Sequence, residues 1–187
     1  MPQVFQPSHV LGIKLALLAL VLLVAVAWIT FYKALPAHSG LLSPQQPIPF
    51  SHKHHAGDDG IDCRYCHYSV EKSAFAGIPS TQVCMSCHSQ LFTDAPVLAP
   101  LFESARTGKP IAWVRVHDLP DFVFFNHSIH IAKGLACGEC HGRVEAMPRI
   151  HRVASLEMQW CLQCHRKMAR ERGLSEARLT DCSTCHR

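Results

Sequence analysis

Ten cysteines and the histidines next to them carry the chemistry of this sequence. The cysteines form five pairs, each spaced Cys-x-x-Cys and each followed directly by histidine. The pairs are Cys63/Cys66, Cys84/Cys87, Cys137/Cys140, Cys161/Cys164 and Cys182/Cys185, and the histidines are His67, His88, His141, His165 and His186. Two thiols at this spacing can form thioether bonds to one haem, whose iron the adjacent histidine can ligate. The pattern predicts five covalently bound haems c with these histidines as proximal ligands.

Two other chemistries also use cysteine pairs. A lone Cys-x-x-Cys is typical of a zinc site or a redox dithiol, and ten cysteines would suit the disulfide framework of a secreted protein. Neither explains why histidine follows the second cysteine in all five pairs. We therefore favour haem attachment over zinc and disulfides.

Histidines upstream of two motifs can supply distal iron ligands. In two places a phenylalanine is followed, two and five residues later, by histidine. These are Phe50 with His52 and His55, and Phe125 with His127 and His130. Residues three apart on a helical turn share a face but diverge, so each pair can reach two different irons. We predict all four histidines to be distal ligands.

The fifth distal position has two candidates. His117 precedes a Leu-Pro turn, and Met158 stands three residues before Cys161. A methionine ligand would raise the potential of its haem relative to a bis-histidine site, although methionine commonly serves packing. Weaker alternatives are His38, His54, Met147 and His151. If the protein fills every sixth position, the haems carry electrons and the chain is not itself an enzyme.

The spacing also shows an internal repeat. The two histidine pairs are 75 positions apart, and the first cysteines of the matching motifs are 74 and 77 apart. This predicts a duplicated two-haem module, in residues 50–88 and 125–165, with a connector at 89–124 and a fifth haem in 166–187.

The haem domain has little material for a conventional core. Roughly 150 residues serve five haems, about 30 each, so most apolar side chains should contact porphyrin. We expect a haem-packed multihaem cytochrome c domain with few regular elements, mostly short helices and loops. Short helices are predicted at 99–106 and 174–178, and short strands interrupted by Pro120 at 111–125.

The formal charge of +4 does not point to nucleic acid. Five haems add about −10 from their propionates, and their ferric cores restore about +5. Arginines can therefore pair with propionates or remain solvated. The candidates are Arg115, Arg143, Arg149 and Arg166.

The N-terminal region reads as a membrane anchor. Residues 15–32 carry no charge, and as a helix they span roughly 27 Å, close to a hydrocarbon core. A signal peptide has a shorter apolar region, so we favour a retained anchor. Covalent haem c is assembled outside the bacterial cytoplasmic membrane, which places the haem domain in the periplasm. The predicted order is a cytoplasmic segment 1–14, a transmembrane helix 15–33, a Pro-rich linker 34–49 and a periplasmic pentahaem domain 50–187.

The two Phe-x-His-x-x-His units with their Cys-x-x-Cys-His motifs resemble the class III cytochromes c, the c3 and c7 cytochromes. The resemblance implies that the first histidine of each pair ligates the haem just downstream. The second histidine would then reach another haem. By this likeness His52 and His127 serve local haems, and His55 and His130 cross to partners.

A wider resemblance covers nearly the whole chain. It rests on the apolar N-terminus and on FSHKHHAGDDGIDCRYCH, IPSTQVCMSCH, RVHDLPDFVFFNHSIH, CGECHGRVEAMP and LEMQWCLQCHR. The chain is similar to the pentahaem membrane-anchored subunit of alternative complex III, a bacterial quinol:electron-acceptor oxidoreductase. A related subunit of periplasmic quinone-reductase complexes carries six motifs. The resemblance implies an iron–sulfur subunit, polytopic quinol-binding subunits and a monohaem cytochrome c as partners.

We therefore expect an electron-transfer subunit of a membrane quinol-oxidising respiratory complex. One alternative is a stand-alone membrane-anchored quinol dehydrogenase that feeds a periplasmic reductase. The long linker and the lack of an acidic residue beside the anchor disfavour it. Another alternative is reduction of a small anion at a five-coordinate haem, which would give a high-spin ferric signal.

Overall fold

The structure is a computed structural model that describes residues 7–34 and 43–187 of the chain. It divides into two compact units, Met1–His38 and Ser39–Arg187, which are treated separately below. His38 and residues 35–42 of the predicted linker lie outside the described residues. Residues 43–49 are described and belong to the second unit, to which Ser43 is tied by a hydrogen bond from its Oγ to the Ile150 carbonyl oxygen (2.9 Å).

The first unit contains one apolar helix, α1 (Pro7–Ala34). The segment His9–Phe31 is long and apolar enough to cross a membrane, so the predicted apolar helix is confirmed. The helix begins earlier than the predicted residue 15, inside the segment expected to be cytoplasmic. Pro7 is favourable there because the first turn needs no backbone N–H donor, and the apolar Val10 and Leu11 continue the run. The side of the membrane on which the second unit lies stays a prediction.

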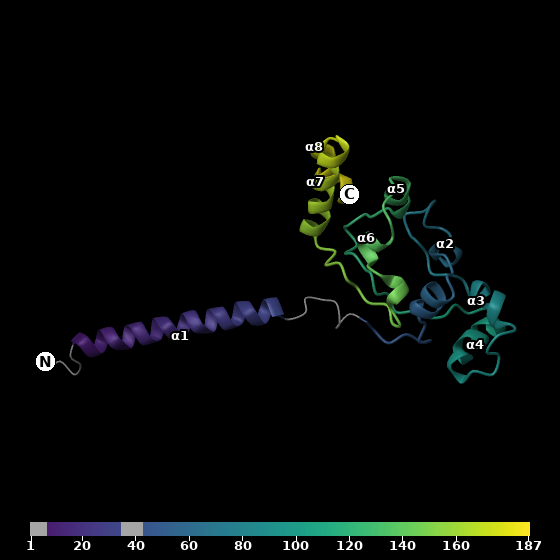
Figure 1. The fold of residues 1–187 in the computed structure, drawn as a ribbon, viewed down its shortest axis with the longest axis horizontal. Coiled ribbons are helices and arrows are strands. Elements are labelled where there is room, and N and C mark those ends of the chain that lie inside the picture. The colour runs from purple at the N-terminus through teal and green to yellow at the C-terminus, as the bar shows by residue number, and fades with distance from the viewer. Residues whose placement is uncertain (1–6, 35–42) are drawn as a thin grey trace. The chain divides into compact units, whose positions relative to one another are not determined.

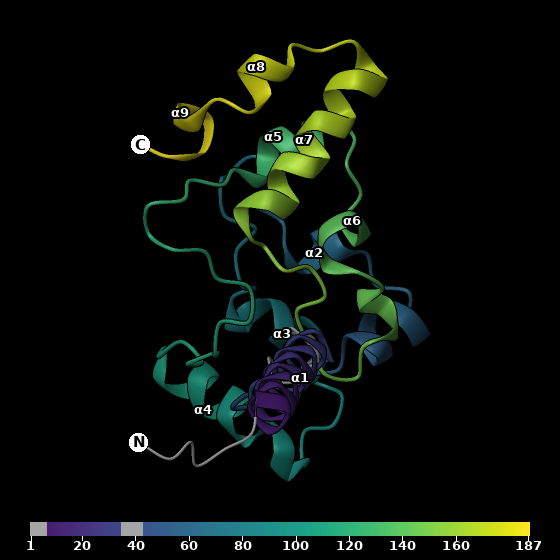
Figure 2. The same ribbon diagram turned by 90° about the vertical axis from the view of Figure 1, so that its left-hand side faces the viewer.

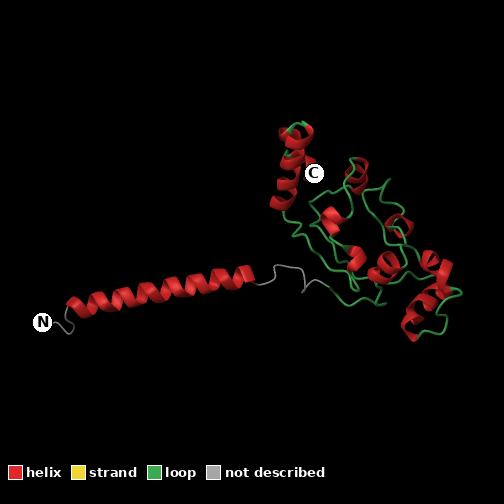
Figure 3. Ribbon diagram, in the orientation of Figure 1, coloured by secondary structure: helices red, strands yellow, loops and turns green. Residues whose placement is uncertain are grey.

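The second unit consists of short helices joined by loops, with no strand among the described residues (Figure 3). This confirms the expected fold class. The sequence predicts short helices at residues 99–106 and 174–178. The nearest helices in the structure are α4 (Ala99–Thr107) and α8 (Glu176–Leu179). The elements are η1 (Lys53–Asp58), α2 (Cys63–Cys66), α3 (Thr81–His88), η2 (Pro96–Leu98), α4 (Ala99–Thr107), α5 (His127–Ala132), α6 (Gly138–His141), η3 (Val144–Ala146), α7 (Met158–Arg172), α8 (Glu176–Leu179) and α9 (Cys182–Cys185).

The strands predicted at 111–125 do not form, and the hydrogen bonds of this segment show why. Gln46 occupies the position of a partner strand with its side chain: its Nε2 donates to the Val114 carbonyl and its Oε1 accepts from the Val114 N–H, both at 2.9 Å. Farther along, the Phe124 N–H donates to the Cys185 carbonyl oxygen (2.8 Å). A side chain thus satisfies the backbone of Val114, and the last residue of α9 (Cys182–Cys185) accepts from Phe124, where a β-ladder would otherwise supply the partners.

In the first copy of the repeat, the spacing between the first histidine and the cysteine motif is one residue longer than in the second copy. The type of helix at this point differs accordingly. His127 precedes its motif by 10 residues and begins α5, an α-helix, whereas His52 precedes Cys63 by 11 and is followed by η1, a π-helix. In η1 the Asp59 N–H donates to the His54 carbonyl five residues back. A wider helical turn accommodates one extra residue without moving its flanks. The π-helix thus accounts for the offset of 75 for the histidines against 74 for the cysteines.

The protein core of the second unit is small. Its buried apolar residues are Ile48, Val70, Leu101, Met147, Ala154 and Ala169. Leu101 lies in α4, which packs on α3 beside a hydrogen bond between Thr81 Oγ1 and Ser104 Oγ (2.7 Å). By contrast, Phe75 is 74% exposed and Phe122 64%. Large aromatic surfaces of this kind fit the expectation that apolar side chains contact porphyrin.

Helices α3 and α4 lie at one end of this unit, and α7, α8 and α9 lie at the other (Figures 1 and 2). The second Cys-x-x-Cys-His motif is in α3 and the fifth is at α9. The motifs are therefore spread along the length of the unit.

Candidate haem-binding sites

Each cysteine pair lies on a helical turn, which puts both thiols on one face. Two of these turns begin with an aspartate cap: the Asp62 side chain accepts from the Arg64 N–H (2.8 Å) and the Asp181 side chain from the Ser183 N–H (2.9 Å). Asp is a preferred residue at this position, so the Asp-Cys-x-x-Cys-His sequence encodes its own helical turn. All ten cysteines are described and none is in a disulfide. No group of three or more potential metal-binding side chains converges in the described ranges.

The histidines of the five motifs are oriented by their Nδ1 atoms. Four of the five have a backbone carbonyl as the Nδ1 partner: His67 with Gly77 (2.7 Å), His88 with Leu91 (3.2 Å), His165 with Leu179 (2.7 Å) and His186 with Phe122 (3.0 Å). A histidine that donates from Nδ1 presents the lone pair of Nε2, which is how metal-bound histidines are normally held. These side chains fit the role of iron ligands.

Three pairs of histidine rings are spaced for one iron between them. A metal–imidazole bond is about 2.0 Å long and the ring centroid lies about 1.1 Å behind the nitrogen, so two imidazoles that bound one iron from opposite sides would have centroids roughly 6.2 Å apart. The observed centroid distances are 6.3 Å for His55 and His88, 6.4 Å for His127 and His141, and 6.2 Å for His130 and His165. The angles between the ring planes are 59°, 7° and 27° respectively.

The two copies of the repeat hold their histidines alike. Phe50 meets the His52 ring edge-on at 4.9 Å and stacks on His55 at 4.4 Å. In the second copy Phe125 meets its first histidine edge-on at 4.8 Å and stacks on its second at 4.4 Å. The phenylalanine therefore sets the orientation of both rings in each copy, which explains its place in the motif.

Hydrogen bonds fix the distal rings as well. The Nδ1 atoms of His55 and His130 lie 2.9 and 2.7 Å from carbonyl oxygens four residues earlier, and that of His127 lies 2.7 Å from the Ala74 carbonyl. His52 differs, because its buried Nδ1 has no partner among the described residues. Burial, followed by the neighbouring His67, lowers the pKa of His52 to about 4. A neutral imidazole is the form that binds a metal.

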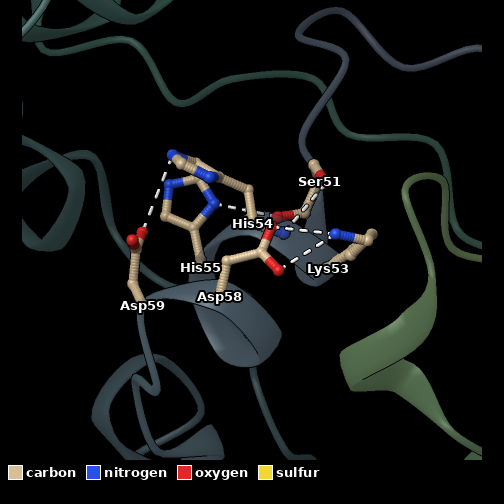
Figure 4. A network of polar contacts seen from close by, with 6 residues as sticks. All are labelled: Ser51, Lys53, His54, His55, Asp58 and Asp59. Atoms are coloured by element: carbon tan, nitrogen blue, oxygen red, sulfur yellow. Dashed lines mark hydrogen bonds and ion pairs between the residues drawn. The ribbon is translucent and has the colours of Figure 1, made fainter.

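His54 lies on the same helical turn, and its ring meets that of His55 edge-on at a centroid distance of 5.3 Å, but its hydrogen-bonding partners differ (Figure 4). Its Nε2 is 3.7 Å from an Asp59 carboxylate oxygen, and its backbone N–H donates to Ser51 Oγ. His55, by contrast, turns its Nδ1 back to the Ser51 carbonyl. Lys53 pairs with Asp58 at 2.9 Å on the exposed side. The structure thus separates the predicted ligand His55 from its polar neighbour His54.

The two candidates for the fifth distal position lie in different surroundings. His117 Nε2 is 3.3 Å from Nδ1 of His141, with the ring planes at 76°. Met158 is 61% exposed at the first residue of α7. Of the weaker alternatives, Met147 is buried in the small core and His151 has its Nδ1 3.3 Å from the Arg149 carbonyl.

Thiols of different motifs are neighbours. Burial raises the pKa of Cys63, and the adjacent Cys137 raises it further. The same two causes, burial first, raise the pKa of four other thiols beside a thiol of another motif. These are Cys66 beside Cys87, Cys84 beside Cys66, Cys140 beside Cys164 and Cys161 beside Cys185. The neighbours link the motifs in the spatial order second, first, third, fourth, fifth.

Three of the four arginines predicted as propionate partners form ion pairs at the surface. Arg115 pairs with Asp118, Arg143 with Glu145 and Arg166 with Glu176, at 2.9, 3.2 and 3.7 Å. The sequence analysis missed Arg152, whose Nε is buried without a partner among the described residues. A guanidinium whose Nε is buried without a partner fits an acidic group such as a propionate. No spacing or motif marks Arg152 in the sequence.

Comparison with known proteins places part of the chain in a family. Residues 123–187, which hold three of the five motifs, match cytochrome c7 and related cytochrome c. The chain is 42% identical over 98 residues to a protein described as "Menaquinone reductase, multiheme cytochrome c subunit" from Nitratidesulfovibrio vulgaris strain Hildenborough. The match covers 52% of this chain and 46% of that protein, so the chain spans about half the length of this curated relative. The C-terminal part is therefore a cytochrome c7-like domain with covalently bound haem c.

Proposed function

We propose that the chain is an electron-transfer subunit with five covalently bound haems c in a membrane-bound, quinol-oxidising respiratory complex similar to alternative complex III. Haem c supplies reversible one-electron chemistry when bound. The protein supplies attachment, axial ligands and orientation. The observation that carries the proposal is the set of three inter-ring distances of 6.2–6.4 Å, each joining a distal histidine to the proximal histidine of a motif.

The ligand assignments follow from those distances. We assign His55 to the second motif, His127 to the third and His130 to the fourth. His52 goes to the first motif for two reasons. Among its ionisable neighbours His67 lowers its pKa most, and its ring meets Phe50 as that of His127 meets Phe125. The first histidine of each pair then serves the local motif, and the second serves the following motif. With both axial positions filled by protein, these sites carry electrons and have no open position for a substrate.

The spatial order of the motifs supports a continuous path. The second motif lies at the end of the unit with α3, and the fifth lies at the other end with α9 (Figure 2). The first, third and fourth motifs connect them through neighbouring thiols. The helix α1 would anchor this unit to a membrane from the periplasmic side.

Purification from membranes in mild detergent tests the proposal. We expect five haems per chain by the pyridine haemochrome assay, further subunits that copurify, and haem reduction on addition of a quinol analogue. Fewer than five haems would contradict the cofactor count. A chain that copurifies with no other subunit and is reduced directly by the quinol analogue would support the stand-alone dehydrogenase instead.

A second candidate function is favoured by the relative described as a menaquinone reductase subunit. In that case the same path would carry electrons toward quinone. The two directions of electron transfer can be distinguished in the purified particle by comparing oxidation of its reduced haems with reduction of its oxidised haems. Rapid oxidation by a quinone analogue, with slow reduction by the quinol form, would support quinone reduction, and the reverse would support quinol oxidation.

A further inference from the structure

His117 differs from every other group that supports a motif histidine. All five motif histidines lie in the described part of the chain, and four have a backbone carbonyl at Nδ1. His141 instead has Nε2 of His117 at 3.3 Å. The ring centroids are 4.4 Å apart and the planes are nearly perpendicular at 76°.

The direction of this hydrogen bond follows from the role of His141. Its ring lies 6.4 Å from that of His127 and parallel to it within 7°, as expected for two axial ligands of one iron. If Nε2 of His141 binds iron, its proton must reside on Nδ1, which then donates. His117 therefore accepts through Nε2.

We propose that His117 is a positioning residue for the iron ligand His141, and that it sets the potential of the haem at the third motif rather than serving as a sixth ligand. The proposal rests on the proposed function, because it requires haem at Cys137 and Cys140. In the paired histidines Nε2 is the nitrogen left to face an iron. In His117 this nitrogen is already engaged by Nδ1 of His141. Met158 then remains as the candidate for the fifth distal position.

An acceptor at Nδ1 increases the electron donation of an axial imidazole and stabilises ferric iron. A carbonyl oxygen is held by the backbone, whereas the His117 acceptor is a side chain that substitution can remove or strengthen. His117→Leu removes the acceptor, so one of the five midpoint potentials should rise. His117→Gln keeps an acceptor oxygen and should restore most of the wild-type value. His117→Glu offers a stronger acceptor and should lower the same potential.

The test uses the complete chain in its membrane particle. Haem content, electron paramagnetic resonance (EPR) spectra and midpoint potentials are compared for the wild type, the three variants and a control, His54→Leu, at an exposed histidine. We expect five low-spin haems throughout and a shift of one potential, upward in His117→Leu and downward in His117→Glu. The shifted haem should be the one with parallel axial planes.

Two outcomes would overturn the proposal while leaving the proposed function intact. A new high-spin ferric haem in His117→Leu would show that His117 is an iron ligand. Five unchanged potentials in His117→Glu would show that the contact has no electronic effect, and this variant decides the matter if His117→Leu does not assemble. By contrast, a wild-type particle without haem at the third motif would refute the proposed function itself.

Discussion

Replacing His130 by alanine should convert one iron to the high-spin state, and that iron should not belong to the nearest motif downstream. The His130 ring faces His165 at 6.2 Å, whereas the motif that follows it in sequence is served by His127. Loss of the imidazole leaves the fourth haem with one axial ligand. About one fifth of the haem iron should therefore become high-spin.

The same change has a calculable cost in stability. It removes the hydrogen bond between His130 Nδ1 and the Asn126 carbonyl (2.7 Å), worth about 1 kcal/mol. It also removes the stacking on Phe125 at 4.4 Å, worth about 0.5–1.5 kcal/mol. The sum of about 2 kcal/mol corresponds to a fall of about 4–8 °C in Tm for a domain of this size, before the lost iron bond is added.

EPR spectroscopy and thermal unfolding of the oxidised protein measure both effects. Ile129→Ala is the matched control, because this side chain lies on the same turn and is 57% exposed. The EPR signal lost should be that of the haem between His130 and His165, whose ring planes lie at 27°. The double variant with His127→Ala should show two high-spin irons. Loss of the signal from the parallel pair in His130→Ala would refute the crossed assignment.

His55→Ala should give one high-spin iron. It should also remove the low-spin EPR signal with the largest g value, because the His55 and His88 ring planes, at 59°, are farthest from parallel among the three pairs. Loss of a different signal would contradict the assignment. Met158→Leu should likewise produce one high-spin iron, at the haem beside His186, and an unchanged spectrum would exclude Met158 as its ligand. Burial lowers the pKa of His52 to about 4 from 6.5, so the unfolded chain binds a proton that the folded chain resists. Stability is then complete above pH 6.5 and falls as the pH drops toward 4, and a Tm that stays flat over this window would contradict the role of His52.

The sequence marks the Cys-x-x-Cys-His motifs more clearly than the path between them. Cysteine pairs and their histidines are local patterns, so spacing alone identified each motif and the duplication. The pairing of His55 with His88 could not be read from spacing, because it joins residues 33 positions apart through folding of the intervening loop. The resemblance to class III cytochromes supplied the rule that the second histidine crosses, and the ring distances agree with that rule.

One wrong prediction and one question that the sequence left open have the same physical origin. The segment 111–125 has strand-forming residues, but strand formation depends on a partner, and Gln46 takes that place. A single histidine such as His117 has no periodicity, so the sequence does not tell a ligand from a residue that supports a ligand. Both questions are decided by contacts between distant segments. The extra residue in the first copy was visible as an offset, yet only the structure shows that η1 absorbs it.

The same contacts imply that the haem sites form together. His127 is held by the Ala74 carbonyl of the first copy, and His186 by the Phe122 carbonyl of the connector. Both histidines therefore depend on a backbone group from a segment more than 50 residues away. The buried apolar core is too small to fix these segments by itself. In the proposed assignment, ligation across the repeat would be a main source of tertiary order. Removal of one crossing histidine should then loosen two segments while both thioether bonds of the affected haem remain intact.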